Sequence, residues 1–341
     1  MSIINFIKDK ITLKPSNKVF HHHSYHLNSQ EFRFLYARFR KKCYNTGKWL
    51  KGGLFLEKIQ INGPYNFDLV IDRLSIDPLI QVNPKERSVK VPMIIEDEPI
   101  AAKVQAVGTT ESPAFVIEGT EGKLKEKADN RLAEIFQWHL PLEEISSHFK
   151  QTDLKEIFKE HYGTPLVLDF SPYSCLLKCI IHQQLNLAFS YTLTERFVKT
   201  FGFEKDGAWF YPLPEKLAEV KVEDLRELQF SGRKAEYVIG IAQEVASGNL
   251  NFEELKEKSD EEIFKKLIKL RGVGPWTIQN FLMFGLGRLN LFPVADIGIQ
   301  NALKRLYQLE AKPTIEQMEN FSKGWEPYLS YASLYLWRSI E

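Results

Sequence analysis

Asp296 is the residue whose type and setting most directly suggest chemistry. It follows the apolar run FPVA and precedes a helical pattern from Ile297 to Tyr307. Aspartate is a preferred N-cap, so helix capping alone would explain its presence. A carboxylate held in a fixed position can also stabilise a developing positive charge and orient or deprotonate an attacking water. The surrounding residues decide between the two interpretations.

A glycine hairpin lies upstream of this aspartate. The segment LRGVGPWT holds Gly272 and Gly274, and Pro275 stands where a new helix would begin. The sequence predicts a helix-hairpin-helix unit over 260–284, whose first helix starts at an S-x-x-E capping box at Ser259. The turn glycines and the unpaired N–H groups of the second helix would form an anion site that suits a DNA phosphate. The alternative is an ordinary αα-hairpin whose glycines serve only the turn.

Composition limits the possible classes of protein. The chain has 341 residues, 44% of them hydrophobic, and a net charge of +1. A protein that binds DNA by ion pairs alone usually has more basic than acidic residues. DNA binding by this chain would therefore depend on local clusters of basic residues or on backbone N–H donors. The three cysteines, Cys43, Cys175 and Cys179, predict a reducing compartment and no disulfide framework. We expect no metal site, at the cysteines or at His21–His23 and His26, and no cofactor.

The absence of a signal peptide pattern and of a long apolar run predicts a cytoplasmic protein with no membrane span, associated with the nucleoid when bound to DNA.

The elements that must position these residues fall into two parts. Residues 1–125 read as a β-rich domain, with strands expected at Phe67–Ile76, Ile100–Val107 and Ala114–Gly119 and a helix from Gln30 to Cys43. Residues 126–341 show helical periodicity throughout. In this second part a short apolar helix, Pro172–Ile181, breaks at HQQ, and Asn186 is the expected N-cap of a helix ending at Gly202. Another helix is expected from Gly232 to Gly248.

Four motifs in a fixed order resemble the helix-hairpin-helix DNA glycosylase superfamily, bacterial 3-methyladenine DNA glycosylase II type. They are IIHQQLN at 180–186, LRGVGPWT at 270–277, FPVAD at 292–296 and WEPYLSYA at 325–332, the last followed by YLW. The likeness covers roughly Asp129 to Arg338. It implies an α+β fold, in which an N-terminal β-rich domain precedes an all-helical two-lobed module with the active site in the cleft between the lobes. Two positions depart from the family pattern: Leu329 stands where an arginine is common, and Asn280 where close relatives often carry an aromatic residue.

The resemblance also implies roles for individual residues. Asp296 would be the catalytic carboxylate. Trp276 and Trp337 would be walls of the base pocket, the alternative being that large aromatics on helices fill the core. Gln184, in the break between two helices, would wedge into the gap left by the flipped nucleotide or would be a solvent-exposed loop residue.

Gly272, Gly274 and Thr277 would contact the DNA backbone. Gln183 and Trp325 are expected to be structural.

The implied function is DNA repair: flipping of alkylated, cationic purines out of the duplex and hydrolysis of their N-glycosidic bond, without strand cleavage. The expected partner is double-stranded DNA containing damaged bases, and no protein partner is inferred. Two alternatives stay open. One is a glycosylase for oxidised purines, which shares the hairpin and the aspartate, and the other is a non-catalytic helix-hairpin-helix DNA-binding protein.

Overall fold

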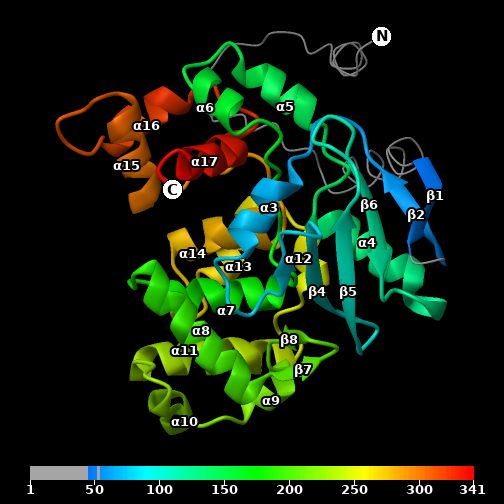
Figure 1. Cartoon of the computed structure of the whole chain (residues 1–341). Coiled ribbons are helices and arrows are strands. Elements are labelled where there is room, and N and C mark those ends of the chain that lie inside the picture. Colours follow the sequence, from blue (N-terminus) through cyan, green and yellow to red (C-terminus); the bar gives the residue numbers. More distant parts are fainter. Residues whose placement is uncertain (1–44, 52–53) are drawn as a thin grey trace, which may run out of the picture.

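The computed structural model describes residues 45–51 and 54–341 (Figure 1). The N-terminal part forms a six-stranded antiparallel sheet with the strand order β1-β2-β6-β5-β4-β3. The strands are β1 Asn45–Lys51, β2 Leu54–Gln60, β3 Val82–Asn83, β4 Ser88–Ile95, β5 Glu98–Ala106 and β6 Ala114–Glu118. The longest pairing joins β4 and β5 in a hairpin, with Ser88 opposite Gln105 and Ile95 opposite Glu98.

Two of the three predicted strands are confirmed, since β5 and β6 match the expected runs. The third prediction is wrong: the segment Phe67–Ile76 forms helix α3, Phe67–Leu74. Asn66 caps this helix by accepting from the backbone N–H of Leu69 at 3.2 Å. Its buried residues, Phe67, Val70 and Ile71, recur at the i, i+3, i+4 spacing of a helix face, and this periodicity outweighs the β-propensity of single residues. The expected helix from Gln30 to Cys43, Cys43 itself and the histidines at 21–26 lie outside the described residues.

A first hydrophobic core joins the sheet to helices from both ends of the described chain (Figure 1). After the 3₁₀ turn η1 Gly122–Leu124, the helices α4 Lys125–Ile135, α5 Leu142–Phe149 and α6 Lys155–Glu160 follow, and α15 Ile297–Leu306, α16 Ile315–Ser322 and α17 Leu329–Arg338 return to the same core. Trp325 is a central member, 1% exposed, which confirms its expected place. The division expected at residue 125 stays a prediction; the core itself continues across that residue.

A second core is built from residues 175–282 together with Leu79. The elements of this stretch of the chain are α7 Pro172–His182, α8 Leu187–Phe201, β7 Phe203–Lys205, β8 Ala208–Phe210, α9 Pro214–Ala218, α10 Val222–Glu227, α11 Gly232–Ala246, α12 Phe252–Lys256, α13 Asp260–Leu267, α14 Pro275–Asn280 and the π turn η2 Phe281–Gly285. Cys175 and Cys179 are buried free thiols of α7. Within the described residues, no helix is both long and apolar enough to cross a membrane.

Local signals explain most boundaries in this core. Asn186 caps α8 through Phe189 N–H at 2.9 Å, and Ser259 and Glu262 form the predicted capping box of α13. The hairpin of β7 and β8 was not predicted. Asp206 and Gly207 form its two-residue turn with φ of +51° and +74°, the type I′ geometry that an Asp-Gly pair favours between strands.

Candidate active site

The carboxylate of Asp296 is held by three hydrogen bonds. Its Oδ1 accepts from the indole N–H of Trp337 at 2.8 Å and from the backbone N–H of Ile299 at 3.1 Å. Its Oδ2 accepts from the indole N–H of Trp276 at 2.9 Å. Asp296 is therefore the N-cap of α15, as the sequence predicts, and it is also clamped by two tryptophans. A carboxylate with both oxygens bound in this way has a fixed position.

Three helix ends bring the clamp together. Trp276 is in the first turn of α14, Asp296 precedes α15, and Trp337 lies in the last turn of α17. Gly298 makes the approach of Trp337 possible, because a Cβ at that position would lie 2.9 Å from the Trp337 ring and 3.0 Å from Asp296 Oδ1. A side chain at 298 would push the indole away from the carboxylate.

A cleft of about 1330 Å³ contains this cluster and is lined by residues of both cores. Asp296, Trp276 and Trp337 all line it, together with Phe284, whose ring centroid is 5.8 Å from that of Trp337.

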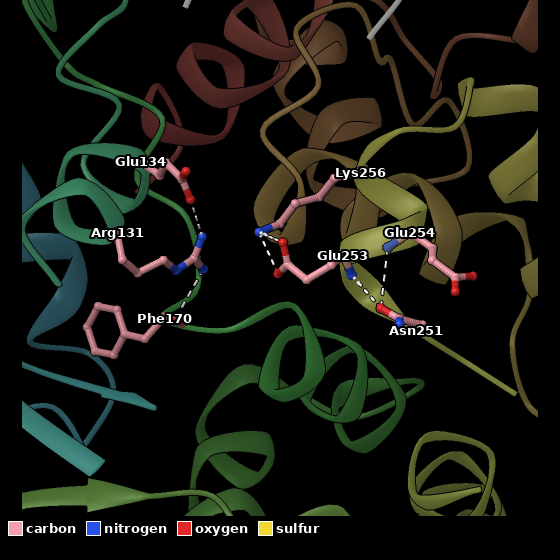
Figure 2. Close-up of polar contacts among 7 residues, drawn as sticks. All are labelled: Arg131, Glu134, Phe170, Asn251, Glu253, Glu254 and Lys256. Carbon is pink, nitrogen blue, oxygen red and sulfur yellow. Dashed lines mark hydrogen bonds and ion pairs between the residues drawn. The ribbon is translucent and has the colours of Figure 1, made fainter. Parts of the chain in front are cut away.

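Figure 2 shows Arg131 of α4 and Lys256 of α12, two further cations that line the cleft, with their side chains pointing toward each other. Each cation is paired on its own side, with Glu134 at 3.0 Å and with Glu253 at 2.8 Å. The charges of these two cations are therefore compensated locally.

The two hairpin glycines have different structural roles. Gly272 has a φ of +83°, and a Cβ there would meet the ring of Tyr237 at 2.2 Å, so the fold requires glycine at this position. Gly274 is the N-cap of α14 with a φ of −108°, and a Cβ there would have nothing within 4 Å. The open side of the hairpin is thus next to Gly274, at the start of α14, where backbone N–H groups have no intrahelical partner.

Thr277 does not offer its side chain to a ligand. It is 1% exposed, and its hydroxyl accepts a hydrogen bond from Gln183 Nε2 at 2.7 Å. The same amide nitrogen donates to the carbonyl of Gly272 at 2.8 Å. The DNA contact that the resemblance implies for Thr277 would therefore be made by its backbone N–H. Gln183 ties the HQQ loop to the hairpin, as a structural residue should.

Gln184 is exposed and has a φ of +57°, so the loop turns sharply and presents this side chain to solvent. The loop is anchored from behind by Lys234 of α11, whose Nζ donates to the carbonyls of Ile181 at 2.5 Å and Gln183 at 2.9 Å. Both the wedge and the exposed-loop interpretation of Gln184 fit this position.

Other charged groups of the cleft were not expected from the sequence. Lys178 forms an ion pair with Asp169, and Arg73 of α3 lies with its guanidinium carbon 5.0 Å from the centroid of Phe284. Burial, and secondarily the charge of Lys178, lowers the pKa of His182 to about 3. Lys178 and His182 lie four residues apart on α7, a spacing that the sequence shows, whereas Arg73 of α3 and Phe284 of η2 are brought together only by the fold.

The fold and the hairpin site define a base excision DNA repair protein of the helix-hairpin-helix kind. Residues 177–327 match the family model described as HhH-GPD superfamily base excision DNA repair protein. A Bacillus subtilis protein named "Putative DNA-3-methyladenine glycosylase YfjP" is 55% identical over 291 residues, which are 84% of this chain and 100% of that protein. This chain belongs to the HhH-GPD superfamily, 3-methyladenine DNA glycosylase type.

Solved structures agree with this assignment. The 3-methyladenine DNA glycosylase from Archaeoglobus fulgidus has a TM-score of 0.73 and 26% identity, covering 82% of this chain and 96% of that one. An 8-oxoguanine glycosylase/lyase from Clostridium acetobutylicum, in complex with double-stranded DNA, has a TM-score of 0.66 over 87% of this chain and 97% of that one. At 20% identity, this second likeness shows the fold alone.

Proposed function

We propose that this protein is a monofunctional DNA glycosylase that flips alkylated, cationic purines out of duplex DNA and hydrolyses their N-glycosidic bond. The observation that carries the proposal is the clamped carboxylate of Asp296 inside the cleft. The names of the B. subtilis relative and of the A. fulgidus glycosylase support the same reaction class.

A single carboxylate is enough for such a substrate. Ordinary glycosidases use a second carboxyl group as an acid for the leaving group. A base that already carries a positive charge leaves with little help, so the remaining task is to stabilise the oxocarbenium-like sugar and to orient water. Asp296 can do both, because its position is fixed and its Oδ2, which accepts from Trp276, keeps a lone pair for a water molecule.

The two tryptophans would then have two tasks. Their indole N–H groups hold Asp296, and their rings line the cleft where a flipped base would stack. Relatives that also cut the strand place a lysine in the hairpin to form a Schiff base, and here Trp276 has no amine. The protein would therefore release the base and leave the strand intact.

DNA would bind across the cleft. We propose that the two cores form two lobes, with Gly272, Gly274 and the N–H of Thr277 on a phosphate and Gln184 in the gap left by the flipped nucleotide. An enzyme of this kind would act in the cytoplasm, on the nucleoid.

The decisive experiment is incubation of the protein with methylated duplex DNA and identification of the released bases. We expect N3- and N7-methylated purines to be released much faster than 8-oxoguanine placed in the same duplex. Faster release of 8-oxoguanine would favour the oxidised-purine alternative. Binding without release of any base would favour a non-catalytic DNA-binding protein.

A further inference from the structure

Arg73 is a half-buried cation whose guanidinium has no polar partner within the described residues. It lies in the last turn of α3, lines the cleft and stacks over Phe284, 5.0 Å from the ring centroid. A guanidinium over an aromatic ring keeps five N–H donors, and the ring accepts no conventional hydrogen bond from them. These donors are therefore available to a ligand in the cleft.

Asn280 offers the complementary group. It is 7% exposed and lines the same cleft at the end of α14. Its Nδ2 donates to the backbone carbonyl of Trp276 at 2.9 Å. A carbonyl can only accept, so the NH₂ must face it and the amide oxygen must face away. In the described part of the chain this oxygen accepts no hydrogen bond, and it is not among the fully enclosed polar atoms without a partner.

A chain of contacts connects each of the two groups to the clamped carboxylate. Trp276, Asn280 and Phe284 follow one another at intervals of four residues from α14 into η2, and all three line the cleft. Trp276 binds Asp296 directly, and Phe284 packs against Trp337, which also binds Asp296. Arg73 lies over Phe284, so the donor is connected to the carboxylate through Phe284 and Trp337, and the acceptor through Trp276.

We propose that Arg73 and Asn280 together read the lactam edge of the flipped purine, the carbonyl at C6 beside the N–H at N1. Arg73 donates to the carbonyl oxygen, and the amide oxygen of Asn280 accepts from the N–H. The inference rests on the proposed function and deepens it: of the alkylated purines, those derived from guanine are preferred over those derived from adenine.

The chemistry of the two edges explains the preference. A guanine-type base presents an acceptor and then a donor, which complements Arg73 and Asn280. An adenine-type base presents an amino donor at C6 and an acceptor at N1, so a donor would face a donor and an acceptor an acceptor. Methylation at N7 withdraws electrons from the ring and makes N1–H a stronger donor. An N7-methylated base carries a positive charge, and its carbonyl oxygen holds the highest electron density of the ring edge. A guanidinium is therefore repelled least when it binds at this oxygen.

The test uses the full chain and duplex DNA carrying both 7-methylguanine and 3-methyladenine, with the two released bases measured in one reaction. The variants are Arg73→Met, Arg73→Lys and Asn280→Leu. Asn320→Leu is the matched control, because Asn320 is an exposed asparagine of α16 that does not line the cleft.

We expect Arg73→Met to lower the ratio of 7-methylguanine to 3-methyladenine excision about tenfold or more, since a hydrogen bond from a charged donor is lost. Asn280→Leu should lower the ratio about fivefold. Arg73→Lys should be intermediate, and Asn320→Leu should match the wild type. An unchanged ratio in Arg73→Met and Asn280→Leu, with both rates reduced equally, would overturn the assignment, as would a ratio that rises.

A second measurement separates this inference from the proposed function. Binding of the free bases 7-methylguanine and 3-methyladenine is followed by quenching of tryptophan fluorescence, which needs no catalysis. Tighter binding of 7-methylguanine by the wild type, lost in Arg73→Met, supports the edge recognition even in a protein that excises neither base. Equal affinity of the wild type for the two bases contradicts it.

Discussion

The indole N–H of Trp337 donates to Oδ1 of Asp296 at 2.8 Å, across 41 residues of sequence. Trp337 therefore does more than line the cleft with its ring, because the hydrogen bond from its indole N–H orients the carboxylate. Trp276 does the same for the other oxygen. The carboxylate is thus oriented before any substrate arrives, which is the arrangement that electrostatic stabilisation of a developing cation requires.

The first prediction concerns the carboxylate itself. Asp296→Asn should retain the fold and the affinity for an abasic-site analogue, because asparagine caps a helix as well as aspartate does. Excision should fall at least about a hundredfold, since the amide carries no charge to stabilise the sugar cation. Single-turnover release of methylated bases is the measurement, with thermal unfolding as the control for folding. Turnover close to wild type would exclude Asp296 as the catalytic group.

The second prediction concerns the clamp. Trp337→Phe keeps an aromatic ring in the cleft and removes one hydrogen bond to Asp296, so we expect kcat to fall about tenfold with little change in KM. The molecule offers a matched control: Trp325 donates to Asp153 at 2.9 Å within the first core. Trp325→Phe should lower stability and leave turnover per folded molecule unchanged. Equal effects of the two variants on turnover would mean that Trp337 acts only through packing.

Local signals in the sequence predicted the cap at Asp296, the capping box at Ser259 and the turn glycines, because each depends on neighbours within a few residues. Local signals of this kind were also present for α3 and for the Asp206-Gly207 turn, but they were not recognised. The β-branched residues of α3 favoured a strand prediction. The Asp206-Gly207 turn lies between segments of helical pattern, so no strands were expected around it. The contacts from Trp276 and Trp337 to Asp296 could not be predicted as hydrogen bonds. They depend on how three helices pack, which residue types and spacing alone do not determine.

The third prediction separates the two hairpin glycines. Gly274→Ala should fold normally, since a Cβ there meets nothing within 4 Å, and should weaken DNA binding alike for all lesions and sequences, since the methyl group occupies the open side of the hairpin. Gly272→Ala should instead destabilise the protein by about 1 kcal/mol or more, through its left-handed φ and the Tyr237 ring. Thermal unfolding and titration with an abasic-site duplex test both. A loss of binding confined to one lesion would show that the hairpin reads the base.

The fourth prediction follows from the absence of an amine at position 276. The wild type should release methylated bases without forming a covalent intermediate with the opened sugar. Borohydride added during turnover should therefore trap no protein–DNA adduct, with a known glycosylase/lyase in parallel to show that trapping works. An adduct from this protein would place a nucleophilic lysine in the cleft, and Lys178→Met would then show whether that lysine is the nucleophile.

The last prediction concerns acid stability. Burial, with the nearby charge of Lys178, lowers the pKa of His182 to about 3, and burial lowers the pKa of His139 to about 4. Both pKa values are below the ordinary histidine pKa of about 6.5. At a pH between the folded and the ordinary pKa of each histidine, the unfolded chain therefore binds more protons than the folded protein. The free energy of unfolding therefore keeps the full contribution of the two neutral histidines above about pH 6.5. As the pH falls below that value, each histidine lowers the free energy of unfolding by at most about 1.4 kcal/mol per pH unit. Urea unfolding at pH 7.5 and pH 5.0 should show a large loss in the wild type and a smaller difference between the two pH values in His182→Gln. An equal loss in both proteins would mean that folding does not lower the pKa of His182.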